Sequence, residues 1–260
     1  MPGPPKTSRG LIPALEDGLN RGSTFNSFVI GSCNQFACEA ARVIAESPGR
    51  VYNPLYLYGP TGLGKTHLMH SIAWHAASAP KANVLYCSGE RFTDEFIKAI
   101  RNGALTQFRK CYRQADLLLC DNVQSLSGRE TQEEFLHVFD ARYDVYKQII
   151  LAGLDAPGEI LKLDRRLAAR FALGLTAELR PPDFDTRLAI LRMKADSLII
   201  NIEPRIIEFI AERISLNVRR LEGALVRVAS YCSLSGGEVN TETVKCLLRD
   251  ILDQEAKEGA

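Results

Sequence analysis

Eight consecutive residues, Gly59 to Thr66, have the types and spacing of a phosphate-binding loop. They read GPTGLGKT and fit the pattern G-x-x-x-x-G-K-[ST] at every position. Glycines let the backbone curl so that its N–H groups point inward, where they bind phosphate oxygens. In such a loop Lys65 reaches the β- and γ-phosphates, and the Thr66 hydroxyl binds Mg²⁺. The pattern predicts a site for ATP or ADP with Mg²⁺.

A predicted strand comes before this loop and a predicted helix follows it, as the mechanism requires. The free N–H groups and the dipole at the start of a helix favour a bound anion. The alternative is a glycine-rich turn that matches the pattern by chance. Such a turn would not be expected to lie between a strand and a helix. The residues expected to contact the nucleotide are Gly59, Gly62, Leu63, Gly64, Lys65, Thr66 and His67.

The stretch LLLCDN, residues 117–122, reads as a buried strand that ends in a carboxylate and then an amide. Asp121 is the expected second ligand of Mg²⁺, because the strand ends at the edge of the sheet where the phosphate loop lies. The alternative is a solvated Asp without a metal role. Asn122 cannot ionise and is a far weaker base than Asp or Glu, although its carbonyl oxygen accepts a hydrogen bond.

His67 and His70 raise the possibility of a separate metal site, because residues three apart share a face of a helix. No acid or cysteine accompanies them at the spacing of metal ligands. We therefore interpret both as ordinary helix positions.

Short, continuously apolar runs alternate with helix-length segments in the first two thirds of the chain. Such runs are typical of strands buried on both faces, and the alternation predicts an α/β fold with a five-stranded parallel sheet. The predicted strands are 55–58, 83–88, 116–121, 148–153 and 175–179. The predicted helices between them are 65–78, 90–101, 104–113, 131–146 and 158–170.

After Pro181 and Pro182 the pattern is helical only, so we expect a small α-helical lid domain there. Its predicted helices are 185–198, 204–214, 217–233 and 241–253. The expected organisation is a mobile leader over 1–23, an α/β domain over 24–180, the lid over 181–253 and a tail over 254–260.

The composition excludes several classes of protein. The 260 residues carry a net charge of +1, so any nucleic-acid surface must be local. The seven cysteines include no CxxC pair, which favours reduced thiols and a cytoplasmic protein over a disulfide scaffold. We find no run long and apolar enough for a membrane segment and no signal-peptide pattern.

Seven segments of the chain together form a distinctive pattern. They are TFNSFVIGSCNQFA (24–37), YNPLYLYGPTGLGKTHLMHSIA (52–73), DLLLCDNVQSLSG (116–128), TQEEFLHVFD (131–140), RRLAARFALGLTAEL (165–179), PPDFDTRLAILRMKA (181–195) and NVRRLEGALVRV (217–228). Taken in order, they resemble the AAA+ domain of the bacterial replication initiator DnaA family. The resemblance runs from about residue 24 to 253, and NVRRLEGAL and TQEEFLHVF are far more specific than the phosphate loop.

The resemblance implies roles for four residues outside the loop. Val29 and Asn34 fall in the segment that lies near the adenine in the family. Arg170 matches the arginine finger, which reaches the γ-phosphate of a neighbouring subunit, so that ATP bridges two copies head to tail. Arg219 matches the sensor arginine of the lid, which contacts the nucleotide in its own chain. Without the resemblance both would read as solvated arginines.

Two positions depart from the family pattern. The family usually has Asp-Asp where this chain has Asp121-Asn122, and a polar residue, often Asp, where this chain has Gly153 and Leu154. Both changes fall on groups that would position or activate the attacking water. We therefore expect ATP binding and ATP-dependent assembly to be kept and hydrolysis to be slow or weak.

The resemblance also implies contact with single-stranded DNA. Residues 91–113 carry six basic and two acidic residues, and basic residues along a groove suit phosphate binding. Ile97 and Lys98 are the best candidates for this contact, and Arg129 is a further one. A solvated charged helix pair is the alternative. The aromatic residues recur at helical spacing, which favours a role in the core: Phe92, Phe96, Phe108 and Tyr112.

Three functions remain open at this point. The first is an initiator-type ATP-binding domain, or a related helicase loader, that assembles on single-stranded DNA. The second is a stand-alone regulator that docks on a full-length initiator and presents Arg170 to its nucleotide. The chain ends where the family's linker to a duplex-DNA-binding domain would begin, which fits either an excised domain or a stand-alone relative. The third, a nucleotide kinase, lacks an acceptor site that we can identify.

Overall fold

The computed structural model describes residues 18–77, 83–198, 202–235 and 240–258. The chain divides into two compact units. The first contains the sheet and helices α1–α6, and the second contains α7–α11 with two short segments, Val29–Gln35 and Pro60–Gly64.

The first unit is built on a five-stranded parallel sheet in the order β2-β3-β4-β1-β5, which confirms the predicted fold class. The strands lie within one or two residues of their predicted positions. They are β1 (Leu55–Tyr58), β2 (Val84–Ser88), β3 (Leu117–Asp121), β4 (Gln148–Gly153) and β5 (Leu175–Glu178). Most residues of β1–β4 are buried, which is why the sequence shows continuous apolar runs there, whereas only Ala177 is buried in the edge strand β5.

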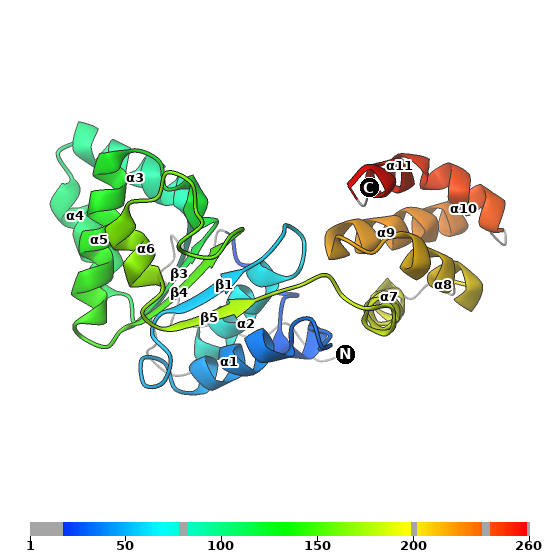
Figure 1. Cartoon of the computed structure of the whole chain (residues 1–260), viewed down its shortest axis with the longest axis horizontal. Helices are drawn as coiled ribbons and strands as arrows, with labels where there is room; N and C mark the ends of the chain where they lie inside the picture. The colour runs from blue at the N-terminus through cyan, green and yellow to red at the C-terminus, as the bar shows by residue number, and fades with distance from the viewer. Residues whose placement is uncertain (1–17, 78–82, 199–201, 236–239, 259–260) are drawn as a thin grey trace. The chain divides into compact units, whose positions relative to one another are not determined.

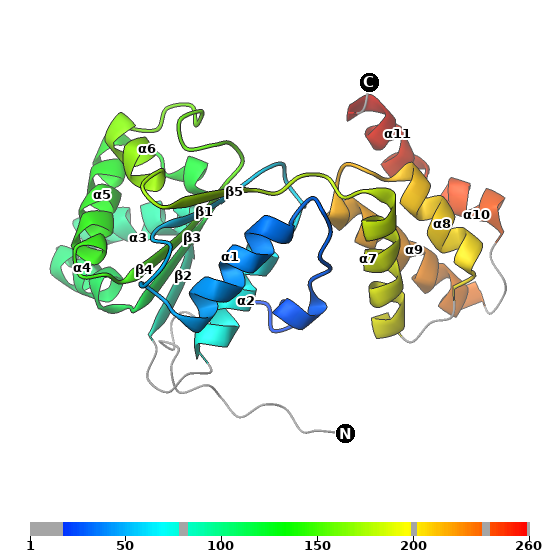
Figure 2. The ribbon, with the colours of Figure 1, turned by 60° about the horizontal axis from the view of Figure 1, so that its bottom comes forward.

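Helices cover both faces of this sheet. Figure 1 and Figure 2 show α1 and α2 on one face and α3–α6 on the other. Alternate strand residues such as Tyr56, Leu118 and Leu151 pack with the aromatic side chains of α3–α6 in one hydrophobic core. The helices are α1 (Gln35–Glu46), α2 (Lys65–Ala77), α3 (Gly89–Arg101), α4 (Leu105–Gln114), α5 (Arg129–Tyr143) and α6 (Arg165–Phe171).

The prediction for residues 158–170 was wrong over its first half, and α1 was not predicted. The helix observed there is Arg165–Phe171, because Lys162 has a left-handed backbone (φ 65°) that interrupts any helix before it. The signal for α1 was present in its buried positions Ala37, Ala41 and Ile44, which recur at helical spacing.

The predicted leader ends earlier than residue 23. Residues 1–17 lie outside the described part of the chain, but Leu19 and Ser23 are buried. The N–H of Asn20 donates to His70 Nδ1 at 3.2 Å, and its carbonyl accepts from Trp74 Nε1 at 2.9 Å. Residues 18–23 therefore pack against α2.

The second unit is a helical bundle with its own core. Its helices are α7 (Phe184–Leu198), α8 (Pro204–Arg213), α9 (Val218–Ser235), α10 (Thr241–Leu247) and α11 (Arg249–Glu258). The predicted helix 241–253 is two helices, since the chain turns at Leu248 and buries its side chain completely.

The predicted tail is also different from the structure, because α11 continues to Glu258. Glu255 is buried, and its Oε1 accepts hydrogen bonds from the backbone N–H groups of Ser215 and Leu216 at 2.6 and 2.5 Å. The end of α11 is thus attached to the turn that precedes α9.

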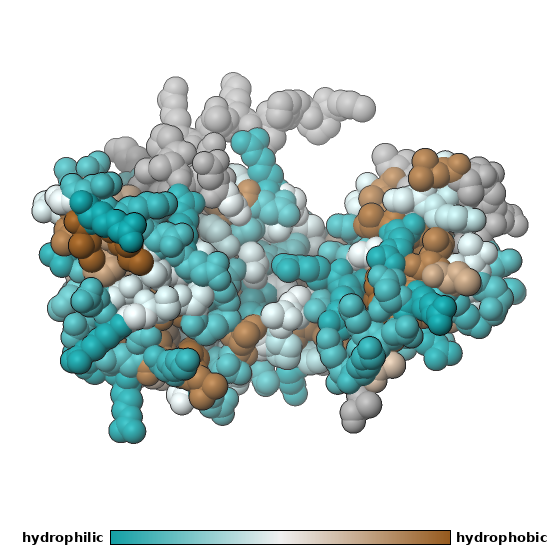
Figure 3. All heavy atoms as spheres, turned by 90° about the horizontal axis from the view of Figure 1, so that it is seen from above, coloured by the Kyte–Doolittle hydropathy of each residue, from teal (hydrophilic) through white to brown (hydrophobic). Residues whose placement is uncertain are grey.

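The surface of each unit is mostly hydrophilic on the face drawn in Figure 3, with apolar side chains in separate groups. The described helices include none that is long and apolar enough to cross a membrane.

Candidate nucleotide-binding site

The phosphate loop has the backbone that its glycines were expected to allow. Gly59, Gly62 and Gly64 have φ values of 139°, 77° and 97°, a region that side chains with a Cβ rarely adopt. The N–H of Gly59 donates to the carbonyl of Leu154 at 3.1 Å, which ties the start of the loop to the end of β4. Helix α2 begins at Lys65, so its free N–H groups lie at the end of the loop.

Lys65 is held inside the protein rather than in solvent. Its side chain is buried, and Nζ donates to the carbonyl oxygen of Gly59 at 2.6 Å. This contact keeps the ammonium group against the first residue of the loop. A fixed positive charge at this place suits an anionic phosphate, since the loop N–H groups supply hydrogen bonds and Lys65 supplies charge.

Thr66 and Asp121 come together as the sequence predicted. The Thr66 hydroxyl donates to Asp121 Oδ2 at 2.6 Å, although 54 residues separate them along the chain. One hydroxyl and one carboxylate oxygen are the kinds of ligand that Mg²⁺ prefers, and Mg²⁺ also takes oxygens from phosphate and water. The donor set therefore fits Mg²⁺ beside the phosphate loop.

Tyr86 is a neighbour of this pair that the sequence analysis did not identify. Its hydroxyl donates to Asp121 Oδ2 at 3.4 Å, and burial raises the pKa of the phenol, so that it stays a donor. The backbone N–H of Asn122 donates to the other carboxylate oxygen, Oδ1, at 2.8 Å. Both contacts orient the Asp121 carboxylate. Nothing in the strand pattern distinguishes Tyr86 from an ordinary core aromatic.

Asn122 has a local structure that explains its residue type. Its backbone is left-handed (φ 56°, ψ 50°), a conformation that Asn adopts more readily than most residues. Its side-chain oxygen accepts a hydrogen bond from the Gln124 amide, and its backbone oxygen accepts one from the Ser125 hydroxyl at 2.7 Å. The side-chain oxygen of Asn122 therefore already accepts one hydrogen bond from the protein.

The end of β4, the second departure from the family pattern, carries no polar side chain at Gly153 or Leu154. An added Cβ at Gly153 would lie 2.1 Å from the hydroxyl oxygen of Tyr56, so a larger residue there would require the Tyr56 side chain to shift. That hydroxyl donates to the backbone oxygen of Asp155 at 2.9 Å. Leu154 is 36% exposed and offers only its backbone oxygen, which accepts from Gly59. No acid occupies positions 153 or 154.

His67 and His70 of α2 are both bonded to the N-terminal segment. Nε2 of His67 lies 2.9 Å from the backbone oxygen of Thr24, and its ring packs against Phe28 with ring centroids 5.2 Å apart. Nδ1 of His70 accepts a hydrogen bond from the Asn20 N–H, and its ring makes a T-shaped contact with the ring of Tyr86. Within the described residues, no group of three or more His, Cys, Asp or Glu side chains could hold a metal ion.

Lowering the pH is expected to release residues 18–23 from α2. Burial lowers the pKa of His70, an effect that Asp121 partly offsets. Because the unfolded chain then binds more protons than the folded one, the contact loses stability as the pH falls below about 6.5. A protonated Nδ1 cannot accept a hydrogen bond from the Asn20 N–H.

Trp74 is the only tryptophan in the sequence, and its Nε1 donates to Asn20, so its fluorescence measures the release of this segment. The same pH profile in His70→Phe would contradict this.

The segment expected near the adenine forms a compact loop within the second unit. Asn34 is buried, its Nδ2 donates to the carbonyl of Val29 at 3.0 Å, and its Oδ1 accepts from the Gly31 N–H at 3.0 Å. Val29 and Asn34 are thus brought together, while Leu63 of the phosphate loop is buried. Arg219 lies in the first turn of α9 and is exposed.

Arg170 lies at the end of α6 on the surface of the first unit. Its side chain is 43% exposed, and Nε donates to Asp140 Oδ1 of α5 at 2.7 Å. The guanidinium is therefore both accessible and oriented.

The expected DNA-contacting residues lie on helix surfaces. Ile97 is 38% exposed, Lys98 beside it is exposed, and Arg129 is exposed at the start of α5. The prediction that the aromatic residues of 91–113 belong to the core is confirmed, since Phe92, Phe96, Phe108 and Tyr112 are buried.

Two of the six basic residues in this region are committed to contacts within the fold. Arg91 pairs with Glu95 at 2.7 Å, and Arg109 makes a bidentate pair with the buried Glu134 at 2.8 and 2.6 Å. The exposed basic side chains that remain are Lys98, Arg101, Lys110 and Arg113.

Comparison with known proteins supports a single family. Residues 19–178 match the family model described as the bacterial DnaA ATPase domain. The chain is 49% identical over 238 residues to the chromosomal replication initiator protein DnaA of Methylacidiphilum infernorum, a match that covers 90% of this chain and 52% of that protein. The chain thus spans about half the length of this curated relative.

Solved structures agree with this result. Domain III of the Thermotoga maritima replication initiation protein DnaA has a TM-score of 0.87 at 38% identity, covering 90% of this chain and 98% of that one. A replication initiator DnaA bound to AMPPCP and single-stranded DNA has a TM-score of 0.77 at 34% identity, covering 85% of this chain and 67% of that one. Both confirm the fold expected from the resemblance.

Proposed function

Because the chain belongs to the family of bacterial DnaA ATPase domains, we propose that it binds ATP with Mg²⁺, assembles in an ATP-dependent way and contacts single-stranded DNA during the initiation of replication. The observation that carries this proposal is the 2.6 Å contact between Thr66 and Asp121 beside the glycine loop and the buried Lys65. The related structure with AMPPCP and single-stranded DNA supports the choice of both ligands.

In the proposed site the loop N–H groups and Lys65 bind the phosphates. Thr66 and Asp121 hold Mg²⁺, which neutralises charge on the phosphate oxygens when bound. Tyr86 and the Asn122 N–H orient the Asp121 carboxylate. Val29 and Asn34 would contact the adenine, and Arg219 of the lid would contact the nucleotide bound in its own chain. Gly59, Gly62, Leu63, Gly64 and His67 complete the site.

Hydrolysis in this site is proposed to be slow. The Asn122 side-chain oxygen is bonded to Gln124, and Leu154 has no polar side chain, so neither position supplies a base for the attacking water. The groups that bind ATP are unaffected. ATP would then act chiefly as a signal for assembly, with the exposed Arg170 contacting the γ-phosphate in the next copy.

Single-stranded DNA is proposed to bind along α3, through Ile97 and Lys98, with Arg129 as a further contact. An exposed apolar side chain next to a positive charge suits a strand whose bases and phosphates are both accessible.

A Lys98→Ala substitution is expected to weaken binding of single-stranded DNA and to lower the slope of log K against log [salt] by about 0.7, because one phosphate contact is lost. Fluorescence anisotropy with a labelled oligonucleotide at several salt concentrations measures both quantities. Lys257→Ala, which removes an exposed lysine from α11, is the matched control and should leave the slope unchanged. Equal slopes for wild type and Lys98→Ala would contradict the proposed contact.

The second candidate is a regulator that presents Arg170 to the nucleotide of a separate initiator. It is favoured by Asn122 and Leu154, because the absence of an acid at both positions would slow hydrolysis in this chain and leave Arg170 in place. Sizing the protein with ADP, with ATP and with ATP plus single-stranded DNA separates the two candidates. Growth of the assembly with ATP and DNA supports the first. A particle of unchanged size that accelerates hydrolysis by a DnaA relative supports the second.

A further inference from the structure

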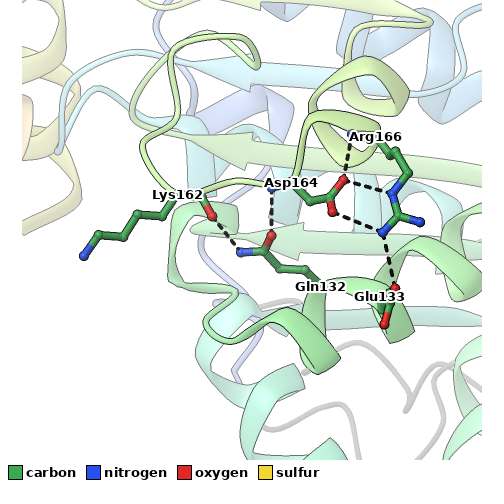
Figure 4. Close-up of polar contacts among 5 residues, drawn as sticks. All are labelled: Gln132, Glu133, Lys162, Asp164 and Arg166. Atoms are coloured by element: carbon green, nitrogen blue, oxygen red, sulfur yellow. Dashed lines mark hydrogen bonds and ion pairs between the residues drawn. The ribbon is translucent and has the colours of Figure 1, made fainter.

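Gln132 connects two segments that are distant in the sequence. It lies near the start of α5 and is buried. Its amide nitrogen donates to the backbone oxygens of Leu126 at 3.0 Å and Lys162 at 3.1 Å, and its amide oxygen accepts from the Asp164 N–H at 2.8 Å. Figure 4 shows this side chain reaching from α5 to the loop before α6. Both of its donors are therefore used to fix main-chain atoms.

The loop that Gln132 holds has an unfavourable backbone at Lys162. The φ of 65° is one that residues with a Cβ rarely adopt, so surrounding contacts must maintain it. The backbone oxygen of Lys162 is bonded to Gln132, while its side chain points away from the cluster in Figure 4. Gln132 thus stabilises the conformation that sets where α6 begins.

Helix α6 depends on this starting point because it is short. It has seven residues, too few for a stable isolated helix. Asp164 caps it by accepting the N–H of Arg166 at 2.8 Å, and the N–H of Asp164 itself is bonded to Gln132. Leu167 and Phe171 are buried and hold one face of the helix.

The far end of α6 carries Arg170. Its ion pair with Asp140 is exposed and so is weak and screened by salt. The pairs of Arg166 with Asp164 and Glu133 are exposed as well (Figure 4). The bonds of Gln132 to Lys162 and Asp164 are part-buried and join uncharged groups, so salt weakens them less than it weakens the exposed ion pairs.

We propose that Gln132 is a positioning residue that holds α6 so that Arg170 reaches the nucleotide bound in a second copy of this chain. This inference rests on the proposed function of Arg170. Gln132 is assigned only to the chain that supplies Arg170, and not to the chain that binds the nucleotide, because the proposed nucleotide site uses other residues.

Two parent variants separate the sides of the contact. A Lys65→Ala chain binds no ATP and can only supply a finger, and an Arg170→Ala chain binds ATP but supplies none. Mixed with ATP and labelled with different fluorophores, the two should pair, as measured by energy transfer. Adding Gln132→Met to the Lys65→Ala chain is expected to weaken pairing by ~10-fold or more, since a small misplacement of such a group is costly. Adding it to the Arg170→Ala chain should change pairing little.

The inference would be overturned if Gln132→Met weakened pairing equally in the two chains. It would also be overturned if Gln132→Met did not weaken pairing when placed in the finger-supplying chain. Failure of the parent variants to pair would instead overturn the proposed role of Arg170, and this inference with it. Gln132→Glu is a second variant of the same size, which sets a carboxylate against the oxygens of Leu126 and Lys162. Gln114→Met, at an exposed glutamine that ends α4, is the matched control and should not alter pairing.

A rescue experiment distinguishes positioning from general loss of stability. Adding Lys162→Gly to the finger-supplying Gln132→Met chain is expected to restore pairing in part, because glycine adopts the left-handed conformation without support. No restoration, in a chain whose melting temperature has recovered, would contradict the inference.

Discussion

The double substitution Asn122→Asp with Leu154→Asp is expected to raise the single-turnover rate of ATP hydrolysis by ~10²-fold, because a positioned acid–base group contributes about 10²–10⁴-fold. Both sites accept the change. Asp tolerates the left-handed backbone at residue 122 nearly as well as Asn does, and Leu154 is 36% exposed. Quenched-flow measurement of ADP formation from bound ATP gives the rate.

Each single substitution should give a smaller gain, because the two acids would act on the same water molecule. The matched control is Asn102→Asp with Val145→Asp, which adds the same charges at exposed positions away from the phosphate loop. If the rate of the double variant equals that of the wild type, the absence of acids at residues 122 and 154 does not limit hydrolysis.

Replacing Arg142 with methionine is expected to lower the free energy of unfolding by about 3 kcal/mol. Arg142 is fully buried, and its guanidinium donates to the backbone oxygens of Tyr112 (2.9 Å) and Ala115 (2.7 Å) at the end of α4 and of Gln148 (3.1 Å) in β4. Burial lowers its pKa to about 10, so it remains charged at neutral pH. Methionine fills similar space but leaves carbonyl oxygens without donors.

Urea unfolding followed by circular dichroism measures this change, and a shift in midpoint at constant slope would show a loss of stability alone. Arg113→Met is the matched control, because Arg113 is an exposed arginine in the last turn of the neighbouring helix α4. An Arg142→Met protein as stable as this control would show that the three hydrogen bonds only offset the cost of burying the charge.

The sequence predicts the parts of this molecule that depend on local pattern. The strands were predicted because a strand buried on both faces reads as a short apolar run, and the phosphate loop was predicted because its chemistry fixes both residue types and spacing. The meeting of Thr66 and Asp121 also followed, since parallel strands end at one edge of the sheet.

Other features depend on contacts that no local pattern encodes. Residues 158–164 belong to a segment predicted as helical, but the fold turns at Lys162 and fixes that turn through Gln132. Arg142 reads as a solvated arginine in a helix, and only the packing of α4 and β4 shows that it is buried. The roles of buried polar residues are set by partners distant in the sequence.

The central claim is that ATP acts chiefly as a signal for assembly. Following assembly and hydrolysis in one sample tests this claim most directly. The protein is loaded with radiolabelled ATP and Mg²⁺, and the size of the assembly and the fraction of bound ATP converted to ADP are followed in the same sample. We predict that assemblies form with ATP and not with ADP, and that the bound nucleotide in them remains largely ATP. Rapid conversion to ADP that Asp121→Ala abolishes, or assemblies that form equally with ADP, would contradict the account.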